Sequence, residues 1–259
     1  MRSNTAVHCH ERQVGRLRVQ SFGTRRDMAA SVGQAIGDEV RQRLARQAEV
    51  RMIFAAAPSQ ADTLESLRGQ EGIDWTRVTA FHMDEYIGLP ARSPQRFACW
   101  LDRHLFSLLP FGTVHRIDPD PDPARAAADY AALLEAATID IVCLGIGVNG
   151  HIAFNDPPVA DFEDPERVKI VTLDAECRQQ QVDDACFDRL DAVPRQAITL
   201  TIPQLMRGER LFCIVPGKAK RAAVRATLHG PITTACPASI LRMHQNCTLH
   251  LDAESDPDA

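Results

Sequence analysis

The stretch IDIVCLGIGVNGHIAFNDPP, residues 139–158, decides the fold class. It opens with an apolar run that predicts a buried strand over 139–147 and then enters a glycine-rich loop. Similar apolar runs alternate with amphipathic segments along the chain. We expect strands at 17–22, 50–57, 78–83, 139–147, 167–173, 197–202, 210–217 and 247–252, and helices at 25–47, 60–70, 93–109, 123–137, 174–182 and 218–229. This alternation predicts an α/β fold with a doubly wound, mostly parallel sheet and helices on both faces, a modified Rossmann-like architecture.

The end segments are polar, and neither an internal repeat nor a low-complexity linker divides the 259 residues. We therefore expect one domain over 17–252, with flexible termini at 1–16 and 253–259. The net charge of −5 argues against nucleic-acid binding, and no apolar run is long enough for a membrane span. The N-terminal segment lacks the apolar core of a signal peptide, so we expect a cytoplasmic protein.

In doubly wound sheets, ligands bind beyond the carboxyl ends of the strands. The segment FHMDEYIGLP (81–90) occupies such a position and places Asp84 and Glu85 just after a predicted strand. Partial burial and a neighbouring charge raise the pKa of a carboxyl group, which suits a general base. The alternative interpretation is an acidic turn that caps the next helix.

The glycine-rich loop follows another predicted strand. Gly145, Gly147 and Gly150 have the G-x-G-x-x-G spacing of a dinucleotide site, but the sequence NDPP (155–158) ends any helix within about two turns. The glycines instead allow backbone N–H groups to approach a polar ligand. We therefore predict no nucleotide cofactor.

His151 follows these glycines, with Asn149 and Asp156 close by in the sequence. A histidine beside a carboxylate can transfer protons near neutral pH, although an exposed histidine in a turn gives the same pattern. No metal site is expected, because the segment His8-Cys9-His10 lacks a second ligand pair at the spacing of a zinc site.

A third segment, VPGKAKRAAVRA (215–226), ends a predicted strand and begins a helix. Lys218, Lys220 and Arg221 lie in the first helical turn, where cations oppose the helix dipole. A bound anion would relieve this conflict. We therefore favour an anion site over a plain solvated helix start.

The segments FHMDEYIGLP and GIGVNGHIAFNDP, in this order, resemble the glucosamine-6-phosphate deaminase and isomerase family. Further similarity extends over residues 20–252. The resemblance implies conversion of an amino-sugar phosphate, with glucosamine 6-phosphate as the expected substrate, to a ketose phosphate and ammonia. It implies neither metal nor cofactor. Related 6-phosphogluconolactonases share the fold and the glycine-histidine loop but lack the M-D-E-Y segment.

The resemblance also implies roles for particular residues. Asp84 matches the base that moves a proton between C2 and C1 of the open-chain sugar, and His151 matches the acid that opens the ring. Asn149 and Asp156 fall where the family orients this histidine. Lys220 matches the phosphate-binding lysine. Ser59, Gly147 and Gly150 complete the expected substrate and phosphate site.

The chain departs from the family pattern at three places. The sequence AAAPSQ (55–60) replaces a glycine- and threonine-rich phosphate loop close to T-G-S-T-P, so that Ser59 alone retains a hydroxyl. Asp156 replaces the usual glutamate. Neither Arg178 nor Arg189 falls in register with the family's phosphate-binding arginine. The substrate therefore stays open among glucosamine 6-phosphate, a galactosamine analogue and a differently charged sugar.

Two alternative functions remain. A lactonase-like hydrolase would use His151 to activate water, but the M-D-E-Y segment argues against it. A non-catalytic sugar-phosphate sensor domain would retain the ligand loop and lose the base and the histidine, which is the reverse of the pattern here. The oligomeric state is also open and includes a homo-oligomer.

Overall fold

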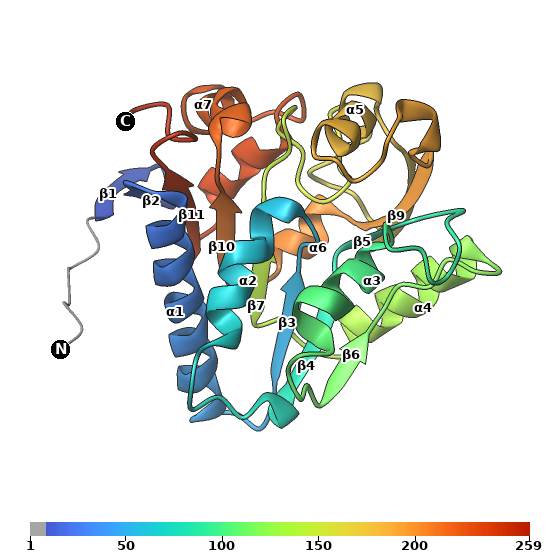
Figure 1. Cartoon of the computed structure of the whole chain (residues 1–259), viewed down its shortest axis with the longest axis horizontal. Helices are drawn as coiled ribbons and strands as arrows, with labels where there is room; N and C mark the ends of the chain where they lie inside the picture. The colour runs from blue at the N-terminus through green and yellow to red at the C-terminus, as the bar shows by residue number, and fades with distance from the viewer. Residues whose placement is uncertain (1–8) are drawn as a thin grey trace.

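The computed structural model describes residues 9–259, and an eight-stranded sheet forms its centre (Figure 1). The strand order is β1-β2-β11-β10-β7-β3-β4-β6. The bounds are β1 Cys9–Val14, β2 Leu17–Phe22, β3 Val50–Phe54, β4 Val78–His82, β6 Thr113–His115, β7 Ile141–Leu144, β10 Arg210–Val215 and β11 Cys247–Asp252. Neighbouring strands are parallel except for the β1–β2 pair. The predicted mostly parallel sheet is therefore confirmed.

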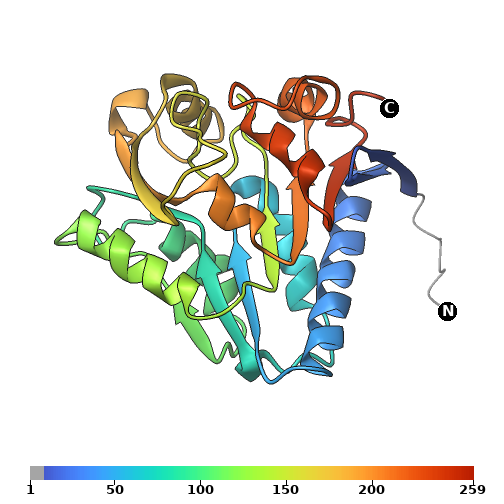
Figure 2. The same ribbon diagram turned by 180° about the vertical axis from the view of Figure 1, so that it is seen from behind.

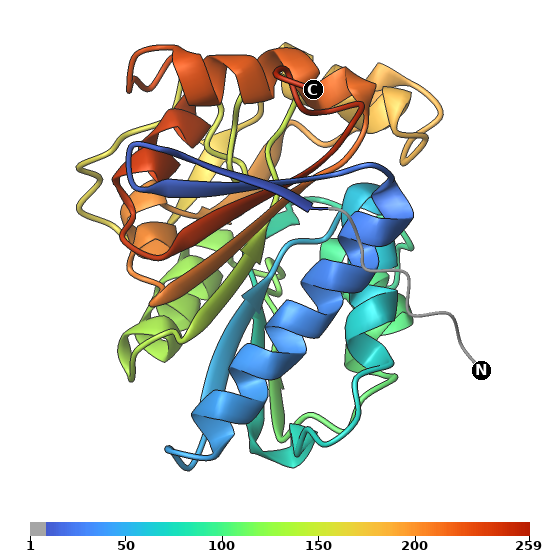
Figure 3. The ribbon, with the colours of Figure 1, turned by 90° about the vertical axis from the view of Figure 1, so that its left-hand side faces the viewer.

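Helices cover both faces of this sheet, as predicted (Figures 1 and 2). One face packs against α1 (Arg25–Leu44), α2 (Ala61–Arg68) and α3 (Phe97–Leu101). The other face packs against α4 (Pro123–Glu135), α6 (Ile202–Met206) and α7 (Arg221–His229). In the side view of Figure 3, α1 and α2 lie on one side of the sheet and α4 on the other. Both core layers are built from fully buried strand residues, which explains the continuous apolar runs in the sequence.

A second, smaller sheet has the order β5-β9-β8 and is antiparallel. Its strands are β5 (Asp84–Tyr86), β9 (Gln196–Leu200) and β8 (Val168–Thr172). We expected the β8 and β9 segments to belong to the parallel sheet. The difference is visible in β8, where Ile170 and Thr172 point to the same face and are exposed, whereas Val171 on the opposite face is buried.

Both ends of the described chain differ from the flexible termini that we predicted. Residues 9–14 pair with β2, and Arg12 donates two hydrogen bonds of 2.8 and 2.6 Å to the carboxylate of Asp256. Ser255 and Asp256 are buried. Strand pairing and a bidentate ion pair thus hold segments that look solvated in the sequence. His8 lies outside the described residues.

The position of the site follows from the strand order. After β3 the chain continues to β4 and β6 on one side, whereas β7, β10 and β11 lie on the other side of β3. The loops after β3 and β7 therefore separate at the carboxyl edge and leave a crevice between them. None of the helices in residues 9–259 has the length and apolar character needed to cross a membrane.

Candidate active site

A pocket lies in this crevice, at the carboxyl ends of β10, β7, β3 and β4. Its walls contain five of the residues selected from the sequence, namely Ser59, Asp84, Gly147, His151 and Lys220. These residues come from four different loops, and the parallel sheet brings the loops to one edge. The prediction that these strand ends converge is confirmed by the structure.

Asp84 is the first residue of β5 and follows β4 after a single intervening residue. The adjoining His82 is buried, its Nδ1 lies 2.9 Å from the Asp84 carbonyl oxygen, and its Nε2 accepts the amide of Ile117 at 2.8 Å. Burial lowers the pKa of His82 to about 3, so its ring is neutral and Nδ1 donates to the carbonyl. His82 therefore fixes the backbone that aims Asp84 at the pocket.

The Asp84 carboxylate is 6% exposed and has no hydrogen-bond donor in the described chain. Burial raises the pKa of this group well above its usual range, and the charges of Glu85 and Asp156 raise it further. A buried carboxyl group with a raised pKa is a stronger base once ionised. This is the property that proton abstraction from carbon requires.

Glu85 caps the next helix, which is the alternative role that we considered for the acidic pair. Its carboxylate accepts the amides of Phe97 and Ala98 at the start of α3, both at 3.0 Å, and the amide of Tyr86 at 2.9 Å. Burial raises the pKa of Glu85 to about 7, and the three N–H donors act against this rise. Of the two acids, one caps a helix and the other faces the pocket.

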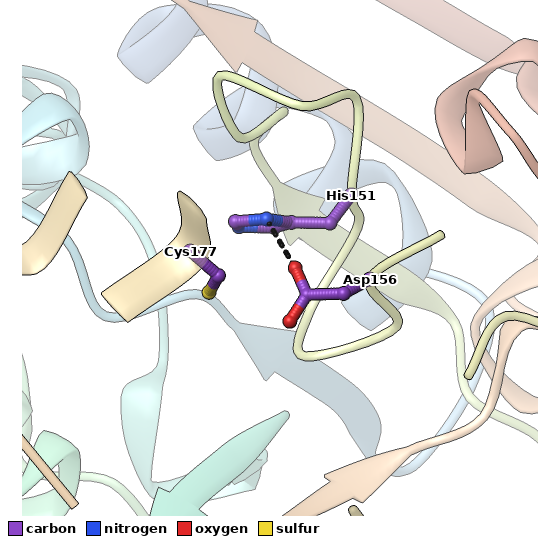
Figure 4. Close-up of side chains that lie close together, drawn as sticks. All are labelled: His151, Asp156 and Cys177. Atoms are coloured by element: carbon purple, nitrogen blue, oxygen red, sulfur yellow. Dashed lines mark ion pairs between the residues drawn. The ribbon is translucent and has the colours of Figure 1, made fainter. Parts of the chain in front are cut away.

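His151 is held by Asp156 and Asn149, and Figure 4 shows its ion pair with Asp156. Its Nδ1 lies 2.9 Å from Asp156 Oδ1 and 2.8 Å from Asn149 Oδ1. Asn149 also donates to Asp156 Oδ1 at 3.1 Å, and the amide of Asp174 donates to Oδ2 at 3.3 Å. Hydrogen bonding to His151 lowers the pKa of Asp156 against the effect of burial. An ionised Asp156 thus fixes the ring through Nδ1, and Nε2 has no partner in the described chain.

The two selected glycines shape this loop from within. A side chain at Gly147 would overlap the imidazole of His151, and a Cβ at Gly150, where φ is +84°, would lie 2.8 Å from Cys236 Sγ. The amide of Gly147 donates to the His151 carbonyl at 2.9 Å, and the amide of Gly150 donates to Gly147 at 3.0 Å. Both N–H groups are therefore used inside the loop, contrary to the expected contact with a ligand. The glycines serve close packing instead.

Cys177, in α5 (Ala175–Asp183), lies beside this cluster (Figure 4). Its Sγ and the ligand-type atoms of His151 and Asp156 all lie within 4.8 Å of one another. These are metal-ligand atom types. However, both oxygens of Asp156 already accept hydrogen bonds from other groups. The geometry is that of a hydrogen-bonded support for His151.

The loop that replaces the family's phosphate loop forms another wall of the pocket. It leads from β3 into a short 3₁₀ turn, Pro58–Gln60. The amides of Ala56 and Ala57 make no hydrogen bond in the described chain, and Ser59 contributes a hydroxyl group. Gln60 holds the loop in place by donating to the Ile214 carbonyl at 3.1 Å. Donors for an anion thus remain without the glycines.

Lys220 supplies the positive charge of the pocket. It ends the turn Lys218–Lys220 before α7, and only 7% of it is exposed. No hydrogen bond or ion pair engages its ammonium group in the described chain, and burial lowers its pKa. The helix start differs from our expectation, because the amide of Gly217 donates to both carboxylate oxygens of Asp252, at 3.1 and 3.0 Å. A carboxylate of the protein itself therefore occupies this position.

Neither arginine of the α5 region reaches the pocket. Arg178 donates to the carbonyl oxygens of Leu190 and Val193, and Arg189 is exposed and pairs with Asp191. Among the described residues that line the pocket, Lys220 is consequently the one Lys or Arg.

Four residues that shape the site were not predicted from the sequence: His82, Gln60, Cys177 and Gln180. Gln180 lines the pocket and accepts the Val148 amide at 2.9 Å, which ties α5 to the glycine-rich loop. His82 was the only one with a usable signal, since it lies next to the M-D-E-Y segment. The others act through contacts distant in sequence.

The fold and the pocket define an α/β protein with a small-molecule site at the switch point of its parallel sheet. Within this class, the chain belongs to the family described as glucosamine-6-phosphate isomerases/6-phosphogluconolactonase, whose model matches residues 23–250. The resemblance inferred from the sequence is confirmed.

Individual relatives agree with this assignment. The chain is 34% identical over 218 residues to glucosamine-6-phosphate deaminase of Exiguobacterium sibiricum, covering 83% of this chain and 84% of the relative. It is 32% identical over 233 residues to the same enzyme of Streptomyces avermitilis, covering 86% and 87%. Among solved structures, a monomeric glucosamine-6-phosphate deaminase superposes with a TM-score of 0.84 at 26% identity, covering 92% of this chain and 98% of that chain. A 6-phosphogluconolactonase from Thermotoga maritima has a TM-score of 0.74 at 20% identity, covering 90% and 98%, and shares the fold.

Proposed function

We propose that this protein is an enzyme that isomerises and deaminates an amino-sugar phosphate, with glucosamine 6-phosphate as the substrate. The observation that carries the proposal is the buried Asp84 carboxyl group, which has no hydrogen-bond donor among residues 9–259 and faces the same pocket as His151. The deaminases that align with most of the chain support the same activity.

His151 performs the first step in this proposal. Asp156 engages Nδ1, so Nε2 is the ring nitrogen available to exchange a proton with the ring oxygen and the C1 hydroxyl of the pyranose. The result is the open-chain aldehyde. The contact of Asp156 with Nδ1 is sufficient support for this step, because the proton moves only between His151 Nε2 and the two sugar oxygens.

Asp84 performs the second step. Its carboxylate takes the proton from C2 and returns it to C1, while a second proton moves from the amino group to O1. The 2-amino aldose thereby becomes the isomeric C2 imine with a C1 hydroxyl group. Addition of one water to this imine releases ammonia and leaves the ketose phosphate. The raised pKa of Asp84 favours the abstraction step.

Lys220, the Ser59 hydroxyl and the amides of Ala56 and Ala57 hold the phosphate in this proposal. A buried ammonium without a partner favours an anion, because the anion compensates an uncompensated charge. Binding at this end leaves C1 and C2 to the acid and the base.

A 6-phosphogluconolactonase-like hydrolase is the second candidate. It would need His151 to activate water and would leave Asp84 without a task. The solved lactonases share the fold at 14–20% identity, which does not extend to activity. Asp84 therefore favours the deaminase.

An ammonia-release assay tests the proposal, with glucosamine 6-phosphate, galactosamine 6-phosphate and free glucosamine as substrates and hydrolysis of 6-phosphogluconolactone as a parallel reaction. We expect ammonia from glucosamine 6-phosphate, loss of this activity in Asp84→Asn, and retention in the exposed control Asp129→Asn. Lactone hydrolysis without ammonia release from any amino sugar would replace the deaminase by the hydrolase.

A further inference from the structure

The side chain of Gln60 joins two strands of the main sheet that are not neighbours. Gln60 is the last residue of the turn Pro58–Gln60 after β3, and its Nε2 donates to the carbonyl oxygen of Ile214 in β10 at 3.1 Å. In the sheet, β7 lies between β3 and β10. The side chain therefore passes over the carboxyl end of β7 to reach β10, and only 2% of Gln60 is exposed.

Gly145, the first residue after β7, leaves room for this passage. A Cβ atom at Gly145 would lie 3.0 Å from Gln60 Nε2 and 3.3 Å from the Ile214 carbonyl oxygen, which are the two atoms of the hydrogen bond. Both distances are shorter than an ordinary van der Waals contact. The first glycine of the G-x-G-x-x-G spacing is thus required by the Gln60 side chain, without any nucleotide.

The orientation of the Gln60 amide group follows from its partners. A backbone carbonyl oxygen only accepts hydrogen bonds, so the atom that faces Ile214 is the amide nitrogen. The same nitrogen lies 3.3 Å from Ser59 Oγ and donates its second hydrogen to this oxygen. Both hydrogens of the amide group are therefore used inside the protein.

The contact with Gln60 decides what the Ser59 hydroxyl group can offer to a ligand. A serine hydroxyl group has one hydrogen to donate and two lone pairs that accept. Towards Gln60 the oxygen accepts, and no group among residues 9–259 accepts its own hydrogen. Ser59 is half-buried and lines the catalytic pocket. Its hydroxyl group is therefore free to donate to a ligand there, which is the polarity that an anion requires.

The hydrogen bond between Gln60 and Ile214 also connects the two loops that carry the anion-binding groups. β10 ends at Val215 and leads into the turn Lys218–Lys220, whose last residue supplies the ammonium group. Ser59 lies on the loop after β3. One buried side chain thus holds the loop of the hydroxyl donor against the strand that leads to the cation.

We propose that Gln60 is a positioning residue of the anion site and that it acts through Ser59. Gln60 fixes the loop after β3 to β10 and occupies Ser59 Oγ as an acceptor, so that the hydroxyl hydrogen donates to the substrate phosphate beside Lys220. The inference rests on the proposed function, because it concerns the phosphate of the same substrate. It explains how the sequence AAAPSQ (55–60) retains an oriented donor without the glycines of the family's loop.

The test is a double-mutant cycle on Gln60 and Ser59. Gln60→Met keeps an unbranched side chain without N–H donors, Ser59→Ala removes the hydroxyl group, and a third protein combines both changes. Ammonia release from glucosamine 6-phosphate gives kcat and KM. Thermal unfolding with increasing inorganic phosphate gives the phosphate affinity without turnover. The control is Gln34→Met, because Gln34 is exposed on α1.

We expect Ser59→Ala to weaken phosphate binding and to raise KM about tenfold or more, as the loss of a hydrogen bond to a charged group does. The kcat should change little, because the anchor is distant from the reacting carbons. Gln60→Met should act in the same direction by a smaller factor, since the hydroxyl group stays but loses its fixed orientation. In the Ser59→Ala background, Gln60→Met should lose most of its effect. Gln34→Met should behave as the wild type.

Gly145→Ala is an independent probe, because it keeps both polar side chains and displaces the Gln60 amide group from Ile214. It should reproduce the rise in KM and the weaker phosphate binding of Gln60→Met, even if Gln60→Met itself fails to fold. The proposal is wrong if the fold changes of Gln60→Met and Ser59→Ala multiply in the combined variant, or if Gly145→Ala binds phosphate as the wild type does. A wild-type protein that is stabilised by phosphate but releases no ammonia would refute the proposed function, and the phosphate titrations would still decide this inference.

Discussion

Lys220→Met should make the protein more stable and bind its substrate less tightly. Lys220 is 7% exposed, and its ammonium group has no partner in the described chain, so the free protein carries a largely desolvated charge without compensation. Methionine keeps the unbranched apolar stem and removes the charge. The same change removes the cation that holds the anion in our proposal.

The two effects can be sized separately. Burying a polar group without a partner costs about 1–3 kcal/mol, which corresponds to a rise in Tm of roughly 2–4 °C per kcal/mol for a chain of this size. A lost hydrogen bond to a charged group costs about 1.5–3 kcal/mol, or roughly a 10- to 150-fold rise in KM. Because a distant anchor acts equally on ground and transition states, kcat should change little.

The pH dependence has a defined sign. Burial lowers the pKa of Lys220 below its ordinary value of 10.5. Between the lowered pKa and 10.5 the unfolded chain holds more protons than the folded one, so the stability of the wild type rises with pH across this window. The advantage of Lys220→Met should therefore be complete below the folded pKa and shrink as the pH approaches 10.5.

Thermal unfolding with and without inorganic phosphate, combined with ammonia-release kinetics, measures these effects. The control is Lys218→Met, because Lys218 lies two residues away and is exposed. Phosphate should raise the Tm of the wild type and of the control more than that of Lys220→Met. A lower Tm for Lys220→Met, or an equal phosphate effect in all three proteins, would refute the reasoning.

Three further changes have defined outcomes. Asp84→Asn should lower turnover by about 10²–10⁴-fold and abolish solvent deuterium incorporation at C1, and a variant that keeps half its activity would exclude Asp84 as the base. The activity of the wild-type protein should fall as the pH drops through the raised pKa of Asp84. His151→Gln should impair the pyranose substrate much more than the open-chain ketose in the reverse reaction, and equal losses would mean that His151 only supports the site. Arg12→Ala should lower the unfolding free energy by about 1–3 kcal/mol, because Asp256 is buried and Arg12 is its ion-pair partner. An unchanged midpoint in denaturant unfolding would show that this ion pair does not hold the C-terminal segment.

The parallel sheet could be predicted because its strands are apolar on both faces and long enough to stand out from the helices. β5 and β6 could not be predicted, since three residues give no periodicity. The β8 and β9 segments were found, but their place in a separate sheet was not. That placement depends on pairing with β5, a contact between distant parts of the chain.

The convergence of Asp84, His151 and Lys220 was predictable because the carboxyl ends of parallel strands meet at one edge. The hydrogen bonding of the backbone amide that precedes α7 could not be predicted. Asp252, 35 residues from Gly217, occupies the amide that we assigned to an anion, and no local pattern reveals such a partner. Local sequence therefore gives the identity of the site, and long-range contacts decide which of its donors remain available.

In our proposal an anion anchor and a strong base share one pocket. A cation next to Asp84 would lower the pKa of this carboxyl group and weaken it as a base. Burial raises the pKa of Asp84 most, and the charges of Glu85 and Asp156 raise it further. In our proposal, Lys220 holds the phosphate at one end of the pocket, and the raised pKa of Asp84 supports proton abstraction from C2 at the other end.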